Sequence, residues 1–352
     1  MAAKKVQISN DAESTWDDLP GSQATFSVDG EQIPDTILGQ NWDSALTGLT
    51  EWKVESNGIF KGFAGYLAEI KKPGTPTIAT DEDCSQESGQ IYAIDDATKD
   101  IWDRSVAVIV KDGVTTVTDE VETIDYLFGR VTFKTSYSVV GDITVDITYL
   151  PTTSLGKGNS YTLNMTANPT DETDFTTAQT NSGSKIFSPG LRSVTFQLQG
   201  IFDATESFKA DITSRNELIL EIDPAGDGSS IARGFFRITS TSQGGSVGAL
   251  EDETVDFTLN VPFEEGPSVE IPFNWRHTAT TLSEALQSAI TSFISELNTY
   301  DVRYLPTGAI GASPNDGIQG NMMVTDISLT GGLNNMNEFN VTMQGVGAFT
   351  VV

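Results

Sequence analysis

The feature that most constrains the fold of this chain is an apolar–polar alternation at both ends of its central segment, Gly190–Pro262. A period of two residues is typical of half-buried β-strands, whose side chains point alternately to the two faces of a sheet. The apolar positions of the first and last predicted strands of this segment are Val194, Phe196, Leu198, Val255, Phe257 and Leu259. The segment therefore predicts one compact β unit.

The interior of the same segment contains two more predicted strands. Glu217–Ile222 is followed by Pro224 and Gly226, which end a strand, and Phe235–Thr239 comes next. A glycine-rich turn then leads into the closing strand. These features predict a mainly β (α+β) fold, built from β-sandwich or half-barrel units that are each flanked by a short helix.

Other parts of the chain repeat pieces of this unit at constant spacing. The motif GL-x8-GIF occurs at 48–60 and again at 190–202, and TVDIT at 144–148 resembles TVDFT at 254–258. Further matches pair Ser268-Val269 and Ala279-Thr280 with Ser193-Val194 and Ala204-Thr205, Pro306-x-Gly308 with Pro224-x-Gly226, and Gly320, Val324 and Thr325 with Gly234, Ile238 and Thr239. Self-similarity at fixed offsets indicates related structural units.

We interpret the chain as an N-terminal arm and three related units. The arm is 1–18, unit A is 19–151 with an insertion at 65–95, unit B is 152–262, and unit C is 263–352 with a helix at 281–298. Within the insertion, 71–90 is predicted to be a loop because it is rich in Pro, Gly, Ser and acidic residues. Long polar segments at 31–47 and 171–189 precede the repeated motif, and we expect them to contact neighbouring molecules; surface-loop drift is the alternative.

The helix of unit C has the clearest local signal. Thr281-Leu-Ser-Glu284 forms a capping box, and the apolar residues that follow recur at helical spacing. A single apolar stripe predicts that this helix lies on a sheet. Weaker stretches at 204–216 and 94–103 predict short helices at the matching places of units B and A.

The composition is strongly acidic, with 20 Lys and Arg against 49 Asp and Glu and a formal charge of −29. Grip on nucleic acid depends on basic side chains that displace counterions, so tight DNA binding is disfavoured. The first residues contain no apolar run, and no segment approaches membrane-spanning length. Cys84 is the only cysteine, so no internal disulfide is expected, and we expect use in a cytoplasm or in a particle assembled there.

No arrangement of residues predicts catalysis or a bound cofactor. His277 is the only histidine, which argues against histidine-based triads and metal sites. Gly156-Lys157-Gly158 lacks the spacing of a phosphate-binding loop, and Asp223–Gly228 lacks the ligand spacing and closing glutamate of a calcium loop. Acidic runs at 80–83 and 119–122 are predicted to be solvated surface. We therefore predict no catalytic, cofactor-binding or metal-binding residue and no enzyme, although a carboxylate pair for acid–base chemistry stays the third alternative.

The motifs taken together resemble the tail tube proteins of long-tailed bacteriophages. The resemblance lies in the polar arm before GL-x8-GIF, a short helix, a strand ending in P-x-G, the G-x3-[IV]-T motif and a closing hairpin. Units B and C carry it best, especially the final EFNVTMQGVGAFTV at 338–351, whereas unit A departs from it in its insertion. Since these positions are mostly apolar or glycine, the resemblance rests on general features of the fold.

The resemblance implies a structural virion protein that polymerises into stacked rings, which form a channel for DNA delivery. It implies sheets that join between subunits into a barrel, a loop that reaches the next ring, and contacts with a tape measure protein and with tail-terminator or baseplate proteins. DNA would pass without specific binding, no membrane would be involved, and the chain would act in the virion tail after assembly in the host cytoplasm. The acidic composition agrees, because a negative channel wall would not hold DNA.

Two alternatives stay open from the sequence. A receptor-binding or adhesin-type β-sandwich module of the virion would favour clustered loop aromatics, but Trp16, Trp42 and Trp275 are far apart in the chain. For the tube, the duplicated arm and motif favour three chains per ring with pseudo-sixfold symmetry, because the resemblance implies six sheet modules per ring. The alternative is six chains, in which one unit builds the barrel and the others lie outside it.

Overall fold

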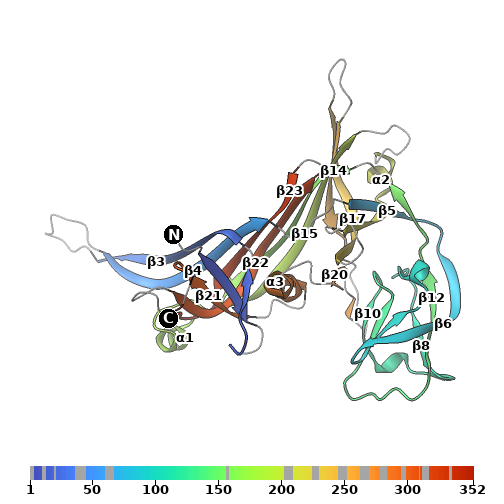
Figure 1. Ribbon diagram of the computed structural model, residues 1–352, viewed down its shortest axis with the longest axis horizontal. Coiled ribbons are helices and arrows are strands. Elements are labelled where there is room, and N and C mark those ends of the chain that lie inside the picture. The colour runs from blue at the N-terminus through green and yellow to red at the C-terminus, as the bar shows by residue number, and fades with distance from the viewer. Residues whose placement is uncertain are drawn as a thin grey trace.

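The computed structural model describes the following residues: 4–9, 13–19, 21–35, 45–59, 67–155, 158–201, 209–223, 230–244, 252–261, 269–270, 272–277, 284–294, 299–308, 310, 317–332 and 335–352. Their strands form one large and one small antiparallel sheet, with a single short parallel pairing in the small one (Figure 1). The predicted mainly β fold is confirmed.

One half of the large sheet, here called module 1, combines the two ends of the chain. The hairpin β3–β4 pairs through β4 with β23, β23 pairs with β22, and β21 pairs with the first part of β22. Helix α3 precedes β21. The bounds are β3 Gly21–Pro34, β4 Ala45–Ile59, α3 Glu284–Ile294, β21 Tyr300–Leu305, β22 Ile318–Gly332 and β23 Asn335–Gly345.

The other half, module 2, pairs its strands in the same order from one continuous stretch of chain. The hairpin β14–β15 pairs through β15 with β18, β18 pairs with β17, and β16 pairs with the first part of β17. Helix α2 precedes β16. The bounds are β14 Gly158–Asp171, β15 Phe187–Ile201, α2 Lys209–Ser214, β16 Glu217–Asp223, β17 Ser230–Gly244 and β18 Asp252–Leu259.

The two modules also share an irregularity in their longest strand. The pairing of β17 with β18 shifts register at Thr239, and that of β22 with β23 shifts at Thr325. In both places the threonine hydroxyl donates to the carbonyl of a residue on the partner strand, Asp256 at 3.1 Å and Thr342 at 3.2 Å. Bulges of this kind bend a strand and re-aim its neighbours, so both strands bend at the same point.

The modules are joined within the chain by an antiparallel pairing of β14 with β22. Residues 160–166 of β14 lie along 326–332 of β22. The result is a continuous sheet of eight strands in the order β17-β18-β15-β14-β22-β23-β4-β3, visible as the long diagonal sheet of Figure 1. Its two outer strands, β17 and β3, belong to different modules.

The main core covers one face of this sheet. Alternate side chains of the eight strands are buried against α3 and against β1 (Lys5–Ser9), which pairs with β21. Val6 and Ile8 of β1 are 1% and 2% exposed. The N-terminal segment, expected as an arm, is therefore part of the sheet and core from β1 through β2 (Asp17–Leu19), because its short alternation supplies two core side chains and an edge for β21.

The small sheet forms a separate inserted domain with its own core. Its strands are β6 Thr77–Ser88, β7 Ile91–Ile94, β8 Ile109–Asp112, β9 Thr115–Thr116, β10 Val121–Asp125, β11 Arg130–Phe133, β12 Ile143–Tyr149 and β19 Val269–Glu270, with 3-10 turns at Ala97–Lys99 and Thr118–Glu120. It connects to module 2 through two paired strands, β5 (Leu67–Pro73) and β13 (Thr152–Leu155), and β5 pairs with β16. Closely spaced ends are usual for a domain inserted into another fold.

The sheets group the strands differently from the predicted units. The prediction of a loop at 71–90 was wrong, because most of that stretch is β-strand. Ala79 and Cys84 of β6 are both buried, and a register shift in the pairing of β6 with β12 lies between them. The TVDIT stretch lies in β12 of the inserted domain, whereas TVDFT lies in β18; the structural counterpart of TVDFT is 340–344 in β23. Likewise Val269 lies in β19 of the small sheet and Val194 in β15 of the large one.

The structure contains a helix in two of the three stretches predicted to be helical. The helix predicted at 281–298 in unit C is observed as α3, and residues 281–283 and 295–298 of the predicted range lie outside the described residues. The stretch 204–216 contains α2, and 94–103 contains one 3-10 turn.

Arg192 of β15 donates from Nη1 to the carbonyls of Phe293 at 2.8 Å and Ile294 at 2.5 Å, which places a cation at the C-terminal end of α3.

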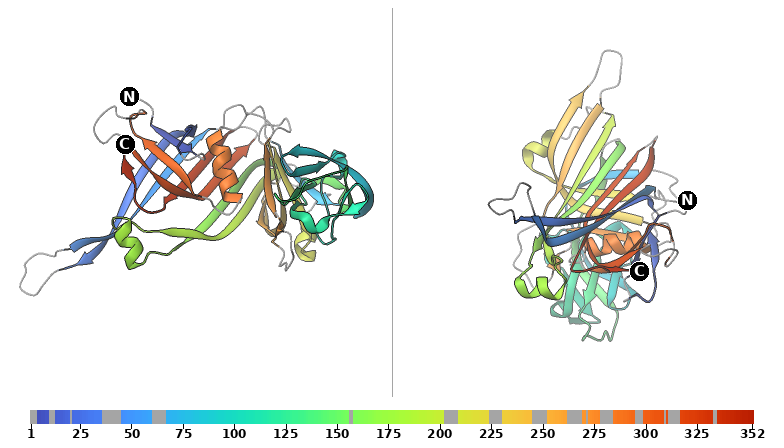
Figure 2. Two further views of the ribbon diagram at one scale, coloured as in Figure 1. Left: turned by 90° about the horizontal axis from the view of Figure 1, so that it is seen from below. Right: turned by 90° about the vertical axis from the view of Figure 1, so that its left-hand side faces the viewer.

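The remaining elements lie at the margins of these sheets. Strand β20 (Phe273–His277) pairs with the first part of β17, and β24 (Thr350–Val351) pairs with β22. Helix α1 (Phe175–Thr180) lies between β14 and β15, beside the hairpin β3–β4 (Figures 1 and 2).

Candidate assembly surface

The face of the eight-strand sheet that points away from the core is polar across its width. Directly paired residues share a face of a sheet, so the strand registers define rows of neighbouring side chains. One row consists of uncharged polar residues on seven strands, namely Thr258, Thr195, Asn164, Ser328, Asn340, Asn57 and Gln23, and ends on the eighth strand at Arg237, which lies opposite Thr258. We call this surface the polar face.

In the two rows that flank this central row, the only charged residues are acidic. They consist of Ser193, Thr166, Asp326, Thr342, Glu55 and Thr25 on one side and of Ser240, Asp256, Gln197, Thr162, Thr330, Glu338 and Ile59 on the other. These rows contain four acidic residues and no basic one. Burial raises the pKa of the Asp326 carboxyl, which lies in the middle of the sheet.

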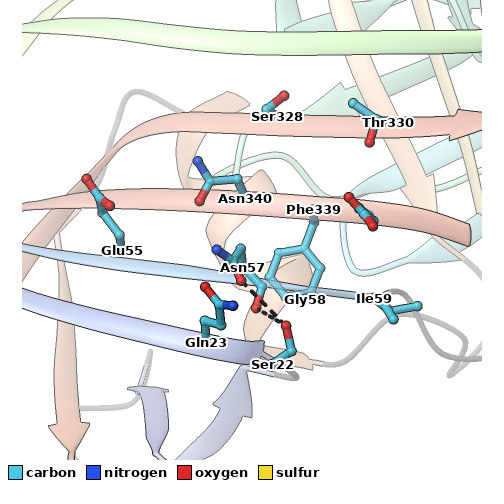
Figure 3. A pocket seen from close by; sticks show the side chains of 11 residues that line it. Ser22, Gln23, Glu55, Asn57, Gly58, Ile59, Ser328, Thr330, Phe339 and Asn340 are labelled. Carbon is cyan, nitrogen blue, oxygen red and sulfur yellow. Dashed lines mark hydrogen bonds between the residues drawn. The ribbon is translucent and has the colours of Figure 1, made fainter.

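A shallow hollow of about 570 Å³ lies over module 1 on this face (Figure 3). Glu55, Asn57, Ser328 and Asn340 of the rows described above line it. Its lining is mostly polar and lacks a cationic side chain, so the hollow offers no charged anchor for an anionic ligand.

Both outer strands of the sheet have an unpaired edge. Among the described residues, β3 pairs with β4 alone, so its other edge is open along Gly21–Pro34. On β17, the edge that pairs with β16 at 232–237 has no partner at 238–244 in the described part of the chain. Open strand edges are templates for pairing with another strand, including one from another chain.

The hairpin β3–β4 also extends well beyond the core. Every described residue from Ser27 to Asp35 is exposed, and Ile33 and Leu46 are 52% and 59% exposed. Figure 1 shows this hairpin as a projection from one end of the sheet. A two-stranded hairpin without a core is marginally stable in water, so a neighbouring molecule would stabilise it.

The structure brings the two predicted arms together at the base of this projection. Thr50 and Ser184 form a parallel bridge, with Thr50 N donating to Gly183 O and Lys185 N donating to Thr50 O, both at 2.8 Å. Lys185 Nζ lies 2.9 Å from Glu31 Oε1. The second arm is not free of regular structure, because it contains α1 and the start of β15; residues 36–44 of the first lie outside the described residues.

An exposed phenylalanine lies at the start of α1. Phe175 is 98% exposed, although the helix is held by a capping box in which Asp174 accepts from the Thr177 backbone at 2.7 Å. Such an exposed aromatic ring on a fixed helix is a candidate contact residue. The sequence contained no signal for it beyond the length of the arm.

The inserted domain is anchored on β16 and the first part of β17, on the side of these strands opposite the main core. Ile219 and Phe235 belong to the core of the inserted domain, whereas their neighbours Leu218 and Phe236 belong to the main core. The strands β16 and β17 therefore separate the two cores.

Arg233 is the central polar contact of this anchor. Its Nη1 lies 2.6 Å from Asp100 Oδ2 and donates to Leu127 O at 2.9 Å, and its Nε lies 2.6 Å from Glu221 Oε2. Burial acts to raise the pKa of the Glu221 carboxyl, but Arg233 and Lys71 outweigh it and the pKa is lowered. Asn274 adds a second link by donating to Asp125 at 2.7 Å, and burial raises the pKa of that carboxyl.

The residues singled out for possible chemistry are dispersed. Cys84 is buried in β6, where burial and nearby Asp95 and Asp83 raise the pKa of its thiol to about 12. His277 ends β20 opposite Ser230. The predicted turn at 223–228 lies almost wholly outside the described residues, as do two of the three residues at 156–158.

The acidic runs and the tryptophans are likewise apart from one another. Asp81 forms an ion pair with Lys111 at 2.7 Å, on the surface of the inserted domain. The guanidinium carbon of Arg303 lies 3.7 Å from the ring centroid of Trp16, and Trp275 Nε1 donates to Ser230 Oγ at 2.8 Å. Trp42 lies outside the described residues. The two described tryptophans that were candidates for an adhesin surface thus have separate intramolecular partners.

Two kinds of feature are absent from the described residues. No group of three or more His, Cys, Asp or Glu side chains there is arranged to hold a metal ion. None of the described helices has the length and apolar character needed to cross a membrane.

Comparisons with known proteins gave only structural likeness. No protein-family model and no curated protein matches the chain. Among solved structures, it is similar to a chain from the tail of an empty gene transfer agent particle refined with helical and C6 symmetry, at 15% identity and a TM-score of 0.28, covering 32% of this chain and 84% of that one. A chain from the virion of a native gene transfer agent particle gives 17% identity, a TM-score of 0.27 and coverage of 32% and 85%. At these TM-scores the likeness carries no argument about function.

Proposed function

We propose that this chain is a structural subunit of a phage-type tail tube, which assembles through its sheet edges into rings that stack around a channel for DNA. The observation that carries this proposal is the eight-strand sheet. It contains two modules with the same strand order side by side, and it ends in one open edge on each module. A head-to-tail contact between two different edges of the same chain closes into a ring when the rotation allows it.

A ring of three chains follows from two modules per chain if the tube has six modules. Three chains would contribute twenty-four strands, eight from each. With neighbouring strands about 4.8 Å apart and tilted by about 40°, such a barrel would measure about 48 Å between opposite backbones. That width leaves room for a DNA duplex after the side chains are added.

The polar face would line this channel. Over seven strands its central row consists of uncharged Thr, Ser, Asn and Gln side chains, with Arg237 of β17 at the end of the row, and the only charged groups of its flanking rows are carboxylates. Retention of DNA depends on cationic contacts, so a wall of this kind favours passage over binding. The inserted domain would lie on the outside of the tube, packed on β16 and the first part of β17 on the side opposite the main core.

The projecting hairpin and α1 would make the contacts between stacked rings. Both lie at one end of the sheet and expose apolar side chains there. At the ends of such a tube, tail-terminator or baseplate proteins would meet the same surfaces, and a tape measure protein would occupy the channel during assembly in the host cytoplasm before the tail joins the virion.

Mass and symmetry test this proposal directly. We expect purified chain to form rings and tubes in negative-stain images as its concentration is raised, and the isolated ring to have a mass of about 113 kDa, from three chains of 37.8 kDa. Mass photometry gives the mass, and the rotational symmetry of tube cross-sections gives the number of chains. A ring of six chains at about 227 kDa would exclude the trimer, and a chain that forms neither rings nor polymers would exclude the tube.

A further inference from the structure

We infer that neighbouring chains join by antiparallel pairing of β3 of one chain with the second half of β17 of the next, with Thr25 opposite Gly244, Ser27 opposite Ser242 and Asp29 opposite Ser240. This inference rests on the proposed function and adds the identity of both partner strands and their register. Its occupant is a second copy of this chain.

The register comes from the junction that the chain already contains. Within the chain, β14 of module 2 pairs with the second half of β22 of module 1, and Asn164 lies opposite Ser328. The module correspondence is fixed by the bulges, which equate β17 with β22, and by the shared pairing order, which equates β14 with β3. In this correspondence Ser27 of β3 takes the position of Asn164, and Ser242 of β17 takes the position of Ser328. The inferred register therefore places Ser27 opposite Ser242.

The open edge of β17 lies where this template requires it. On β22, one edge holds β21 at residues 318–322 and then β14 at 326–332. On β17, the equivalent edge holds β16 at 232–237, and residues 238–244 beyond it have no partner in the described part of the chain. The unpaired residues 238–244 of β17 therefore correspond in position to residues 326–332 of β22, which pair with β14.

Exposure changes as this comparison predicts. Met165 of β14 and Ile327 of β22, which face each other at the internal junction, are both 0% exposed. Val28, the counterpart of Met165, is 44% exposed, and Thr241, the counterpart of Ile327, is half-buried. The equivalent positions of the outer strands thus lack the cover that a neighbouring strand supplies.

The edge of β17 is also more polar than its counterpart on β22. Thr241 and Gln243 replace the core residues Ile327 and Leu329, and both donate to Glu253, Thr241 at 3.0 Å and Gln243 at 3.3 Å. A polar edge limits indiscriminate strand pairing by the free chain. Because no like charges oppose each other in the inferred register, pairing with β3 is not opposed electrostatically.

A cysteine pair tests the register. The Ser27→Cys/Ser242→Cys variant is expected to form disulfides between chains under mild oxidation, so that a non-reducing gel shows dimers and closed trimers in place of most of the monomer. Direct partners across a strand pair are within bridging distance. The native Cys84 is buried and does not compete. The Asn164→Cys/Ser328→Cys variant is the matched control, since it places the same pair at the internal junction and should form its disulfide within one chain.

A displaced pair and the assembly state separate the possible outcomes. Ser27→Cys/Ser240→Cys shifts one partner by two residues on the same face, and we expect at least tenfold less covalent trimer from it. Rings that form without crosslinking of Ser27→Cys/Ser242→Cys, or that crosslink the displaced pair as well, would overturn the inferred junction and leave the tube intact. If neither wild type nor variant assembles and no intermolecular crosslink appears, both the tube and the junction are refuted.

Discussion

Replacing Arg233 with methionine is expected to lower the free energy of unfolding by about 3 kcal/mol, because it removes one partner from a buried ionic network. The change leaves Asp100 without its cation and Leu127 O without its donor, while Glu221 keeps Lys71 at 2.9 Å. Arg233 is 7% exposed, so water cannot replace these contacts without opening the interface between the inserted domain and module 2. Urea unfolding followed by circular dichroism measures the loss.

Two further variants show whether the effect comes from the unpaired charge. Adding Asp100→Asn to Arg233→Met removes the orphaned carboxylate and should recover part of the lost stability. Lys5→Met breaks an exposed ion pair with Asp18, whose atoms lie 2.8 Å apart, and should cost less than about 1 kcal/mol. If Arg233→Met costs no more than Lys5→Met, the network does not anchor the inserted domain.

Removing the projecting hairpin is expected to abolish tube formation while the chain stays folded and still forms rings. In this variant an Asn-Gly turn replaces residues 31–49, so that it connects the paired residues Gly30 and Thr50. A two-residue Asn-Gly connection suits a β-hairpin. The described residues it removes are exposed or half-buried, so the free energy of unfolding should change by less than about 1 kcal/mol. Negative-stain images measure tube length and count rings.

The variant Glu31→Gln is the control for this deletion, because it removes only the ion pair with Lys185 and should leave tubes of normal length. Loss of cooperative unfolding in the hairpin deletion would mean that the segment belongs to the folding unit. Tubes of unchanged length would mean that the hairpin makes no contact between rings.

The sequence predicted the elements whose local pattern is strong. Alternation identified β15 and β18, since each of these strands buries one of its two sides in the main core. The run 217–222 before Pro224 and Gly226 identified β16, which is buried on both sides. The capping box and apolar stripe identified α3. Fixed spacing also aligned Gly234 and Thr239 with Gly320 and Thr325, and these positions occupy matching places in β17 and β22.

Matches at constant spacing gave a wrong structural correspondence where similar short strands belong to different sheets. TVDIT and TVDFT have the same alternation, but one lies in the inserted domain and the other in module 2, because the alternation requires a buried face without specifying which core buries it. The acidic stretch in β6 was mistaken for a loop because its three consecutive acidic residues hide an irregular strand: Glu82 lies opposite the buried Val145, and a register shift separates Glu82 from Ala79. Composition averaged over the two sides conceals such a strand.

By itself, then, the sequence determined the β character, the two copies of the GL-x8-GIF hairpin, the position of α3 and the excess of negative charge, all of which depend on residues near one another in the chain. Only the tertiary structure decided that module 1 joins the N-terminal hairpin to the C-terminal strands, with β4 paired to β23. It also decided which polar residues form one face and which edges remain open. The physical reason is that strand pairing uses backbone hydrogen bonds, which are the same for every sequence, so partner choice depends on how all side chains pack together in the cores.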